Sequence, residues 1–108
     1  MTAKPIVLRA QARLDMEQAI DWYRGEAGEE VAVGFVDAAY RAWRAIADNP
    51  AISSPRYAHE LNLPGLRSRT LRRYPYLVFY IEHENHIDVW RVLHAQRDIP
   101  ASLQEREG

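Results

Sequence analysis

Hydrophobic residues recur along this chain with two different periods, and each change of period marks a new element. A short apolar run over Ile6–Arg9 predicts a first strand. Residues 12–23 then carry apolar side chains at helical spacing, and a second helical stripe runs from about Glu29 to Asp48. Gly25 and Gly28 are expected to stop the first helix, with Gly25–Ala27 as the break between the two, and Asn49-Pro50 to end the second. The pattern predicts an antiparallel helical hairpin.

The second half of the chain changes to strand-like alternation. Pro50–Pro64, with three prolines and no sustained period, predicts a long loop. Three strands are expected over Leu66–Arg72, Tyr76–Glu82 and His86–Ala95, because aromatic and β-branched residues dominate the last two. From Ala101 onward the chain is polar, which predicts a frayed tail. The predicted fold is α+β: a strand, a helical hairpin and a three-stranded antiparallel meander.

A two-residue turn at Glu84-Asn85 would set the register of the last hairpin. It places Phe79 opposite Trp90 and Leu77 opposite Val92, so both faces of the hairpin are apolar. The helical hairpin can cover only one face, so we expect the other to bind a partner. The residues predicted on one face are Tyr76, Val78, Tyr80, Ile87, Val89, Arg91 and Leu93.

Length and composition limit the classes of protein. With 108 residues we expect a single domain over 1–108, a core over about 5–98 and a polar tail over 101–108. The absence of cysteine excludes a disulfide scaffold and a thiol nucleophile. No apolar run is long enough for a membrane span, and Met1–Leu8 lacks the apolar core of a signal peptide. We therefore expect a cytoplasmic protein without membrane association.

Charge is unevenly distributed although the formal net charge is only −1. Eight acidic residues and three arginines lie between Asp15 and Asp48, whereas Arg56–Arg73 contains five arginines and one acid. The near-neutral total argues against a whole-surface nucleic-acid binder. The basic segment is consistent with a solvated strand edge or with a binding patch for an acidic partner.

Few residues suggest chemistry. His83 and His86 would be cross-strand neighbours, but no third metal ligand is evident, and no metal or other cofactor is expected. His94, Arg91 and Arg97 surround the last strand, where a histidine and arginines could support metal-free phosphodiester cleavage. The same residues could instead have only structural roles, and the residues alone favour the structural interpretation.

The order of elements, and the ending Arg91-Val92-Leu93-His94-Ala95-Gln96-Arg97-Asp98, resemble the ParE/RelE superfamily of bacterial toxins from toxin–antitoxin modules. The first helix, the Asp48-Asn49-Pro50 helix ending and the Pro64-Gly65-Leu66-Arg67 strand entry are also similar to that superfamily. The resemblance covers about residues 5–98. It implies a toxin of a type II, plasmid-stabilisation-like system that a cognate antitoxin neutralises.

The resemblance also separates two activities. RelE-like members cut messenger RNA with basic strand residues and a C-terminal tyrosine, but the matching positions here are Ser68, Thr70, Leu77 and Leu103. Of that set only Arg97 is retained, and losing the others should cost several powers of ten in rate. If the chain were nevertheless a nuclease, Arg97 and His94 would be its catalytic residues. The ParE branch, without a known catalytic site of its own, is the better match.

The ParE branch implies DNA gyrase as the target and no sequence-specific nucleic-acid binding. We expect Arg91, His94 and Arg97 to contact the target. Antitoxin segments are typically acidic and fold on binding, so the basic strand and the uncovered apolar face should receive the antitoxin. The residues predicted to contact it are Arg67, Arg69, Val78, Tyr80, Val89 and Leu93. Alternatives are a RelE-like mRNA interferase and a degenerate member that only binds antitoxin.

Overall fold

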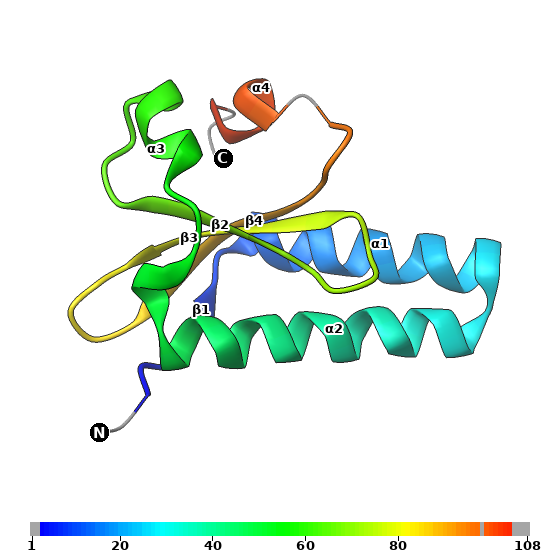
Figure 1. Cartoon of the computed structure of the whole chain (residues 1–108). Coiled ribbons are helices and arrows are strands. Elements are labelled where there is room, and N and C mark those ends of the chain that lie inside the picture. Colours follow the sequence, from blue (N-terminus) through cyan, green and yellow to red (C-terminus); the bar gives the residue numbers. More distant parts are fainter. Residues whose placement is uncertain (1–2, 98, 105–108) are drawn as a thin grey trace.

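A four-stranded mixed sheet separates two helical layers. The computed structural model describes residues 3–97 and 99–104. Strand order is β1-β4-β3-β2, with β1 parallel to β4 and the other neighbours antiparallel. Helices α1 and α2 lie against one face and α3 and α4 against the other (Figure 1). The elements are β1 (Ile6–Leu8), α1 (Ala10–Ala27), α2 (Glu29–Asp48), a 3-10 turn (Pro50–Ile52), α3 (Arg56–Leu61), β2 (Leu66–Thr70), β3 (Tyr76–Glu82), β4 (Ile87–His94) and α4 (Ile99–Gln104). The predicted α+β class is confirmed.

The helical hairpin turns at a single residue. Helix α1 continues through Gly25 to Ala27, so the expected break at Gly25–Ala27 is wrong, whereas the predicted stop at Gly28 is confirmed. Gly28 alone separates the helices, with φ of 97°, a left-handed conformation that glycine adopts without steric cost. Its backbone N–H donates to the carbonyl of Tyr23 at 3.1 Å, which gives a carbonyl group in the last turn of α1 a hydrogen-bond partner. Helix α2 has the predicted bounds.

The first core lies between the helical hairpin and the sheet. Small buried residues of α2 allow close packing of α1. Near the turn of the helical hairpin lies an aromatic cluster, in which Tyr23 contacts Phe35, Tyr74 and Tyr76. Burial raises the pKa of Tyr23, and the neighbouring Tyr76 and Tyr74 raise it further. The buried members are Ala12, Met16, Ala19, Tyr23, Ala32, Phe35, Ala39, Ala42, Ile46, Leu71, Val78, Tyr80, Ile87, Val89 and Val92.

The second face of the sheet is also covered, which contradicts two predictions. The segment predicted as a loop, Pro50–Pro64, contains α3, and the segment predicted as a tail contains α4. Their apolar residues enclose a second core, made of Leu66, Phe79, Leu93, Ile99 and Leu103. Both helices have only six residues, so packing against this core, rather than helical periodicity, accounts for them. Residues 105–108 of the expected tail lie outside the described part.

The last hairpin contains a β-bulge that the predicted register lacked. Ile81 faces Asp88 as expected, but Phe79 faces Arg91 instead of Trp90, because the register shifts between Phe79 and Tyr80. A bulge adds one residue to one strand, so the residues beyond it change faces relative to their partners. Leu93 therefore joins Phe79 in the second core and does not lie beside Val78 and Tyr80.

Candidate functional site

Arg91 is buried in an ion pair with Asp15 of α1. Its Nε and Nη2 donate to the two carboxylate oxygens at 2.8 and 3.0 Å, and its Nη1 donates to the Ser102 carbonyl at 3.0 Å. Strand β1 pairs with β4 only as far as Val89, so it does not reach Val92. The Asp15 carboxylate accepts the Val92 backbone N–H at 2.9 Å. Asp15 thus replaces the missing strand neighbour, and the pair connects α1, β4 and α4.

This geometry corrects the role predicted for Arg91. Only 5% of the residue is exposed, and its guanidinium is bonded to Asp15 and Ser102 and does not face a surface. A buried charge that loses its partner is strongly destabilising, so the pair is a structural feature first. The prediction that Arg91 presents its charge to a target is therefore wrong in its geometry.

His94 and Arg97, the other two residues predicted to contact the target, lie in one pocket at the exit of β4. The pocket, with a volume of about 370 Å³, is lined by Asp15, Gln18, Ala19, Trp22, Tyr76, Val92, His94 and Arg97. Trp22 on α1 is 58% exposed, and the sequence analysis did not select it. Its position outside the apolar stripe of α1 was the available signal, because a large aromatic on a polar helix face is unusual. Asp98 lies outside the described residues.

The His94 ring has a defined orientation in this pocket. It packs edge-on against Tyr76, with ring centroids 5.2 Å apart, and its Nδ1 accepts the Gln96 backbone N–H at 3.1 Å. A neutral His94 therefore carries its proton on Nε2. Burial raises the pKa of Tyr76, and the positive charge of Arg97 opposes that rise. The pocket thus combines a cation, an imidazole and two aromatic rings.

Four apolar residues predicted to contact the antitoxin are not accessible. Val78, Tyr80 and Val89 are fully buried beneath the helical hairpin, and Leu93 is fully buried on the other face. The prediction of an uncovered sheet face is wrong, because α3 and α4 cover it.

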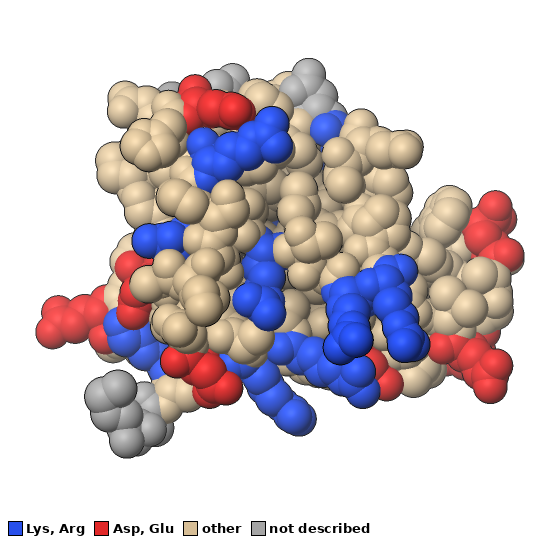
Figure 2. Space-filling view, viewed as in Figure 1, with Lys and Arg blue, Asp and Glu red and all other residues tan. Residues whose placement is uncertain are grey.

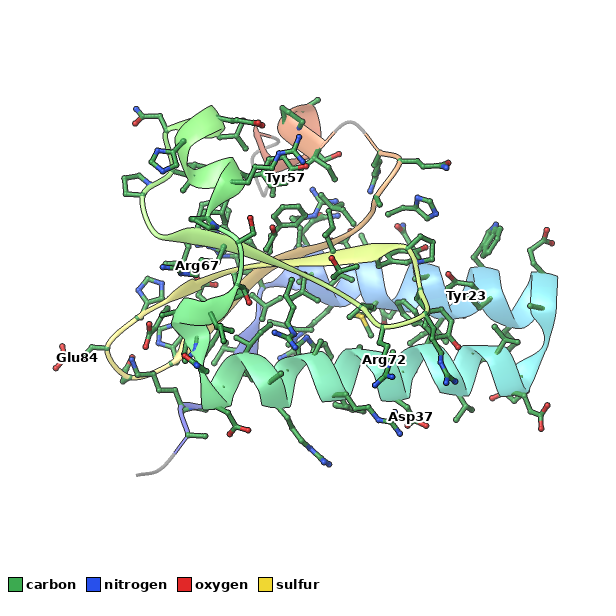
Figure 3. All side chains as sticks on the ribbon, viewed as in Figure 1. Tyr23, Asp37, Tyr57, Arg67, Arg72 and Glu84 are labelled. Atoms are coloured by element: carbon green, nitrogen blue, oxygen red, sulfur yellow. The ribbon has the colours of Figure 1, made fainter. Side chains whose placement is uncertain are left out.

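The two arginines predicted to bind the antitoxin are only partly accessible. Arg67 and Arg69 are half-buried on the outer strand β2, and Arg67 donates from Nη1 to the Ser53 carbonyl at 2.7 Å. Figure 3 labels Arg67 on this strand, beneath α3.

Exposed apolar surface lies instead along α2 and the outer strand β1. A groove of about 360 Å³ is lined by Ile6, Leu8, Tyr40, Trp43, Arg44 and Ala47. Tyr40 is 55% exposed, and the neighbouring Val7 is 46% exposed. The indole N–H of Trp43 is buried without a hydrogen-bond partner among the described residues. Sequence reasoning missed this groove, although Tyr40 lies outside the apolar stripe of α2.

The two histidines of the β3–β4 turn stack on each other. The His83 and His86 rings lie 4.7 Å apart, and His83 Nε2 is 3.2 Å from Asp88 Oδ2. Within residues 3–97 and 99–104, no group of three potential metal ligands is present. Among the helices of that same part of the chain, none has the length and apolar character of a membrane span.

The positions that match the basic and tyrosine residues of RelE-like nucleases hold no charge. Ser68 and Leu103 are buried, Leu77 is half-buried, and only Thr70 is exposed. Leu77 and Leu103 belong to the second core and its border. Arg97 and His94 are brought together elsewhere, in the pocket at the exit of β4.

Fold and surface define a small α+β protein with the element order that the ParE/RelE resemblance implied. Residues 6–99 match the family described as the ParE toxin of the type II toxin-antitoxin system, parDE. This match spans most of the chain, which therefore belongs to the ParE toxin family. A solved chain described as "Chromosomal ParDE TA system from P. aeruginosa" is similar, with a TM-score of 0.72 and 20% identity. The match covers 87% of this chain and 98% of that chain, and it shows the fold. No curated protein matches the chain.

Proposed function

We propose that this ParE-family toxin inhibits growth in the cytoplasm by poisoning DNA gyrase, and that it is not itself an enzyme. The observation that carries the proposal is the uncharged set of residues at the positions of the nuclease chemistry, Ser68, Thr70, Leu77 and Leu103. Cleavage of RNA needs groups that stabilise the charged transition state, and none of these side chains carries the positive charge that the basic residues would supply. Membership of the ParE family supports gyrase as the target.

The pocket at the exit of β4 is the surface that we propose for the target. It presents Arg97 and His94 beside the exposed ring of Trp22, an arrangement suited to a protein surface with both charged and apolar groups. The same juxtaposition favours the second candidate, a metal-free ribonuclease that uses His94 as acid or base and Arg97 for charge stabilisation.

Two assays separate these candidates. The purified toxin should inhibit supercoiling by gyrase and accumulate cleaved plasmid DNA, and messenger RNA on translating ribosomes should stay intact. Trp22→Ala and Arg97→Ala should each reduce cleaved DNA about tenfold or more, if they are contacts at the centre of the interface. Cleavage of messenger RNA that disappears in Arg97→Ala would establish the nuclease instead. A folded protein that binds antitoxin but is inactive in both assays would identify a degenerate toxin.

For the antitoxin, which the ParE family implies as partner, we propose the groove between β1 and α2. Strand β1 is an outer strand, and an added extended segment would hydrogen-bond to its free edge. Tyr40 and Trp43 offer apolar anchors, and Arg44 suits an acidic segment. Tyr40→Asp should weaken antitoxin binding at least tenfold. Unchanged affinity in Tyr40→Asp, beside an equally unchanged Leu14→Asp control on α1, would reject this surface.

A further inference from the structure

Three arginines whose side chains have no partner among the described residues surround one hollow between α2 and the β2–β3 turn. The hollow, of about 340 Å³, is lined by Gly34, Asp37, Ala38, Arg41, Arg72, Arg73 and Tyr74. Arg41, Arg72 and Arg73 are exposed, and none of their side chains has a hydrogen bond or ion pair to another described residue. Three arginines and one aspartate give the hollow a net charge of +2.

Several other arginines of the chain have side-chain partners, and what sets Arg41, Arg72 and Arg73 apart is that three arginines without such partners line one hollow together. Arg9, Arg24, Arg56 and Arg91 each form an ion pair with an acidic residue. Arg67 is bonded to a backbone carbonyl. The three side chains around the hollow therefore retain their hydrogen-bond donors for a ligand. Figure 2 shows Lys and Arg side chains gathered over α2 and the β2 edge, and Figure 3 labels Arg72 pointing toward α2 near Asp37.

The turn that carries Arg72 and Arg73 is held firmly on α2. The Tyr74 hydroxyl donates to the Val31 carbonyl at 3.1 Å, and its ring packs against Phe35 and Tyr23. Gly34 makes this approach possible, because a Cβ there would collide with the Tyr74 hydroxyl. Arg73 has φ of 72°, a conformation in which glycine would be less strained. The backbone of the turn is thus fixed beside α2, and Arg73 occupies a position that backbone strain alone would not select.

We propose that Arg41, Arg72 and Arg73 form a binding site for the phosphodiester backbone of nucleic acid, which the toxin contacts without reading base sequence. Arginine binds phosphate through several planar donors, and a cluster of three can contact adjacent phosphates. This site goes beyond the proposed function, since it is separate from the β4 pocket and its ligand can be tested without gyrase.

The lining of the hollow favours phosphate over an acidic protein segment. A segment that folds on binding needs apolar anchors, but the Tyr74 ring is packed inward and the other neutral residues are Gly34 and Ala38. The exposed apolar residues Tyr40 and Trp43 line the groove on another face of α2. An acidic antitoxin segment therefore has a better surface elsewhere.

Salt-dependent DNA binding tests the proposal. Binding of the full-length toxin to a short labelled DNA duplex of arbitrary sequence is measured by fluorescence anisotropy over a series of salt concentrations. Each phosphate contact contributes about 0.9 to the slope of log K against log salt for duplex DNA. The triple variant Arg41→Gln/Arg72→Gln/Arg73→Gly should reduce the magnitude of that slope by about 2–3. The reduction should be the same for duplexes of different sequence.

A matched triple variant controls for total charge. Arg13→Gln/Arg24→Gln/Arg56→Gln removes the same number of positive charges from exposed positions on α1 and α3 and should leave the slope nearly unchanged. Thermal unfolding of each variant checks that it is folded, and Arg73→Gly alone keeps the test valid if the triple variant does not fold. Equal slopes for the two triple variants would overturn the proposal, as would no binding of the parent toxin at the lowest salt. Loss of antitoxin affinity with unchanged DNA binding would instead assign the hollow to an acidic protein.

Discussion

Two groups of arginines in this molecule have opposite surroundings. Arg91 is 5% exposed and donates to Asp15 and to the Ser102 carbonyl, so its charge is paired inside the fold. Arg72 and Arg73 lie on an exposed turn, and their side chains have no hydrogen bond or ion pair to another described residue. The comparison separates charge that maintains the structure from charge that is available to a ligand. Substitutions in the first group should change stability, and those in the second should change binding.

The largest expected effect is at the buried pair. Arg91→Ala leaves the Asp15 carboxylate buried with the Val92 N–H as its one remaining donor among the described residues, and breaking such a pair costs about 3–5 kcal/mol of unfolding free energy. Chemical denaturation measures this loss. Arg97→Ala, on the exposed turn nearby, is the control and should change stability by less than about 0.5 kcal/mol. A loss below about 1 kcal/mol for Arg91→Ala would contradict a structural role.

The sequence could not reveal the surroundings of Arg91, and the reason is a single residue. The alternation of apolar residues predicted strands β3 and β4 and the tip of their hairpin, but a bulge at Phe79/Tyr80 shifts the rest of the register. One shifted residue reverses which face a side chain occupies. Bulges depend on tertiary context, so the pattern of residues alone placed Arg91 and Leu93 incorrectly.

Other parts of the site were predictable to different degrees. Long helices with a clear period, such as α2, were predicted within their observed bounds. Helix α3 was missed because it has six residues and depends on contacts of Tyr57 and Leu61 with the second core. His94 and Arg97 were selected from sequence and do share a pocket, whereas Trp22 joins them only through the packing of α1 beside β4.

A second prediction concerns the support of the arginine hollow. Gly34→Ala should lower the free energy of unfolding by about 1–2 kcal/mol, because the new methyl displaces the Tyr74 hydroxyl and its hydrogen bond to Val31. Thermal or chemical unfolding measures the change. In a Tyr74→Phe background the obstacle is removed, so the same substitution should stabilise α2 by about 1 kcal/mol through helix propensity. The same sign in both backgrounds would rule out the proposed contact.

Asp88 represents an intermediate case, a pair that is partly exposed. Burial raises the pKa of Asp88, but hydrogen bonds and charge from Arg9, with further hydrogen bonds from His83 and Trp90, outweigh that effect and lower it overall. A lowered pKa in the folded state gives stability that is present above the ordinary carboxylate range and is lost as pH falls through the folded value. The Arg9 side chain is 37% exposed, so solvent screening limits the contribution to about 1 kcal/mol.

The test is the pH dependence of Asp88→Asn. At neutral pH the variant should be less stable than the parent chain by about 1 kcal/mol, and the difference should shrink toward zero in acid as the parent carboxylate protonates. Denaturation curves at several pH values measure it. Glu84→Gln, at an exposed position of the β3–β4 turn, serves as the control. A difference that stays constant across the acid range would show that the carboxylate charge is not responsible.

The smallest expected effect, at Arg73, sharpens the comparison of the two groups of arginines most, because this substitution should raise the free energy of unfolding where Arg91→Ala lowers it. Arg73→Gly should raise the free energy of unfolding by about 0.5 kcal/mol: glycine relieves the positive φ of 72°, and its greater freedom in the unfolded chain offsets part of that gain. The adjacent Arg72 has no positive φ, so Arg72→Gly should instead cost about 0.5–1 kcal/mol. Both variants remove one unpartnered arginine and differ only in backbone conformation. If the two changes in unfolding free energy had the same sign in denaturation experiments, the positive φ of Arg73 would not be a source of strain. The position of its side chain beside the hollow would then have no energetic cost of that kind.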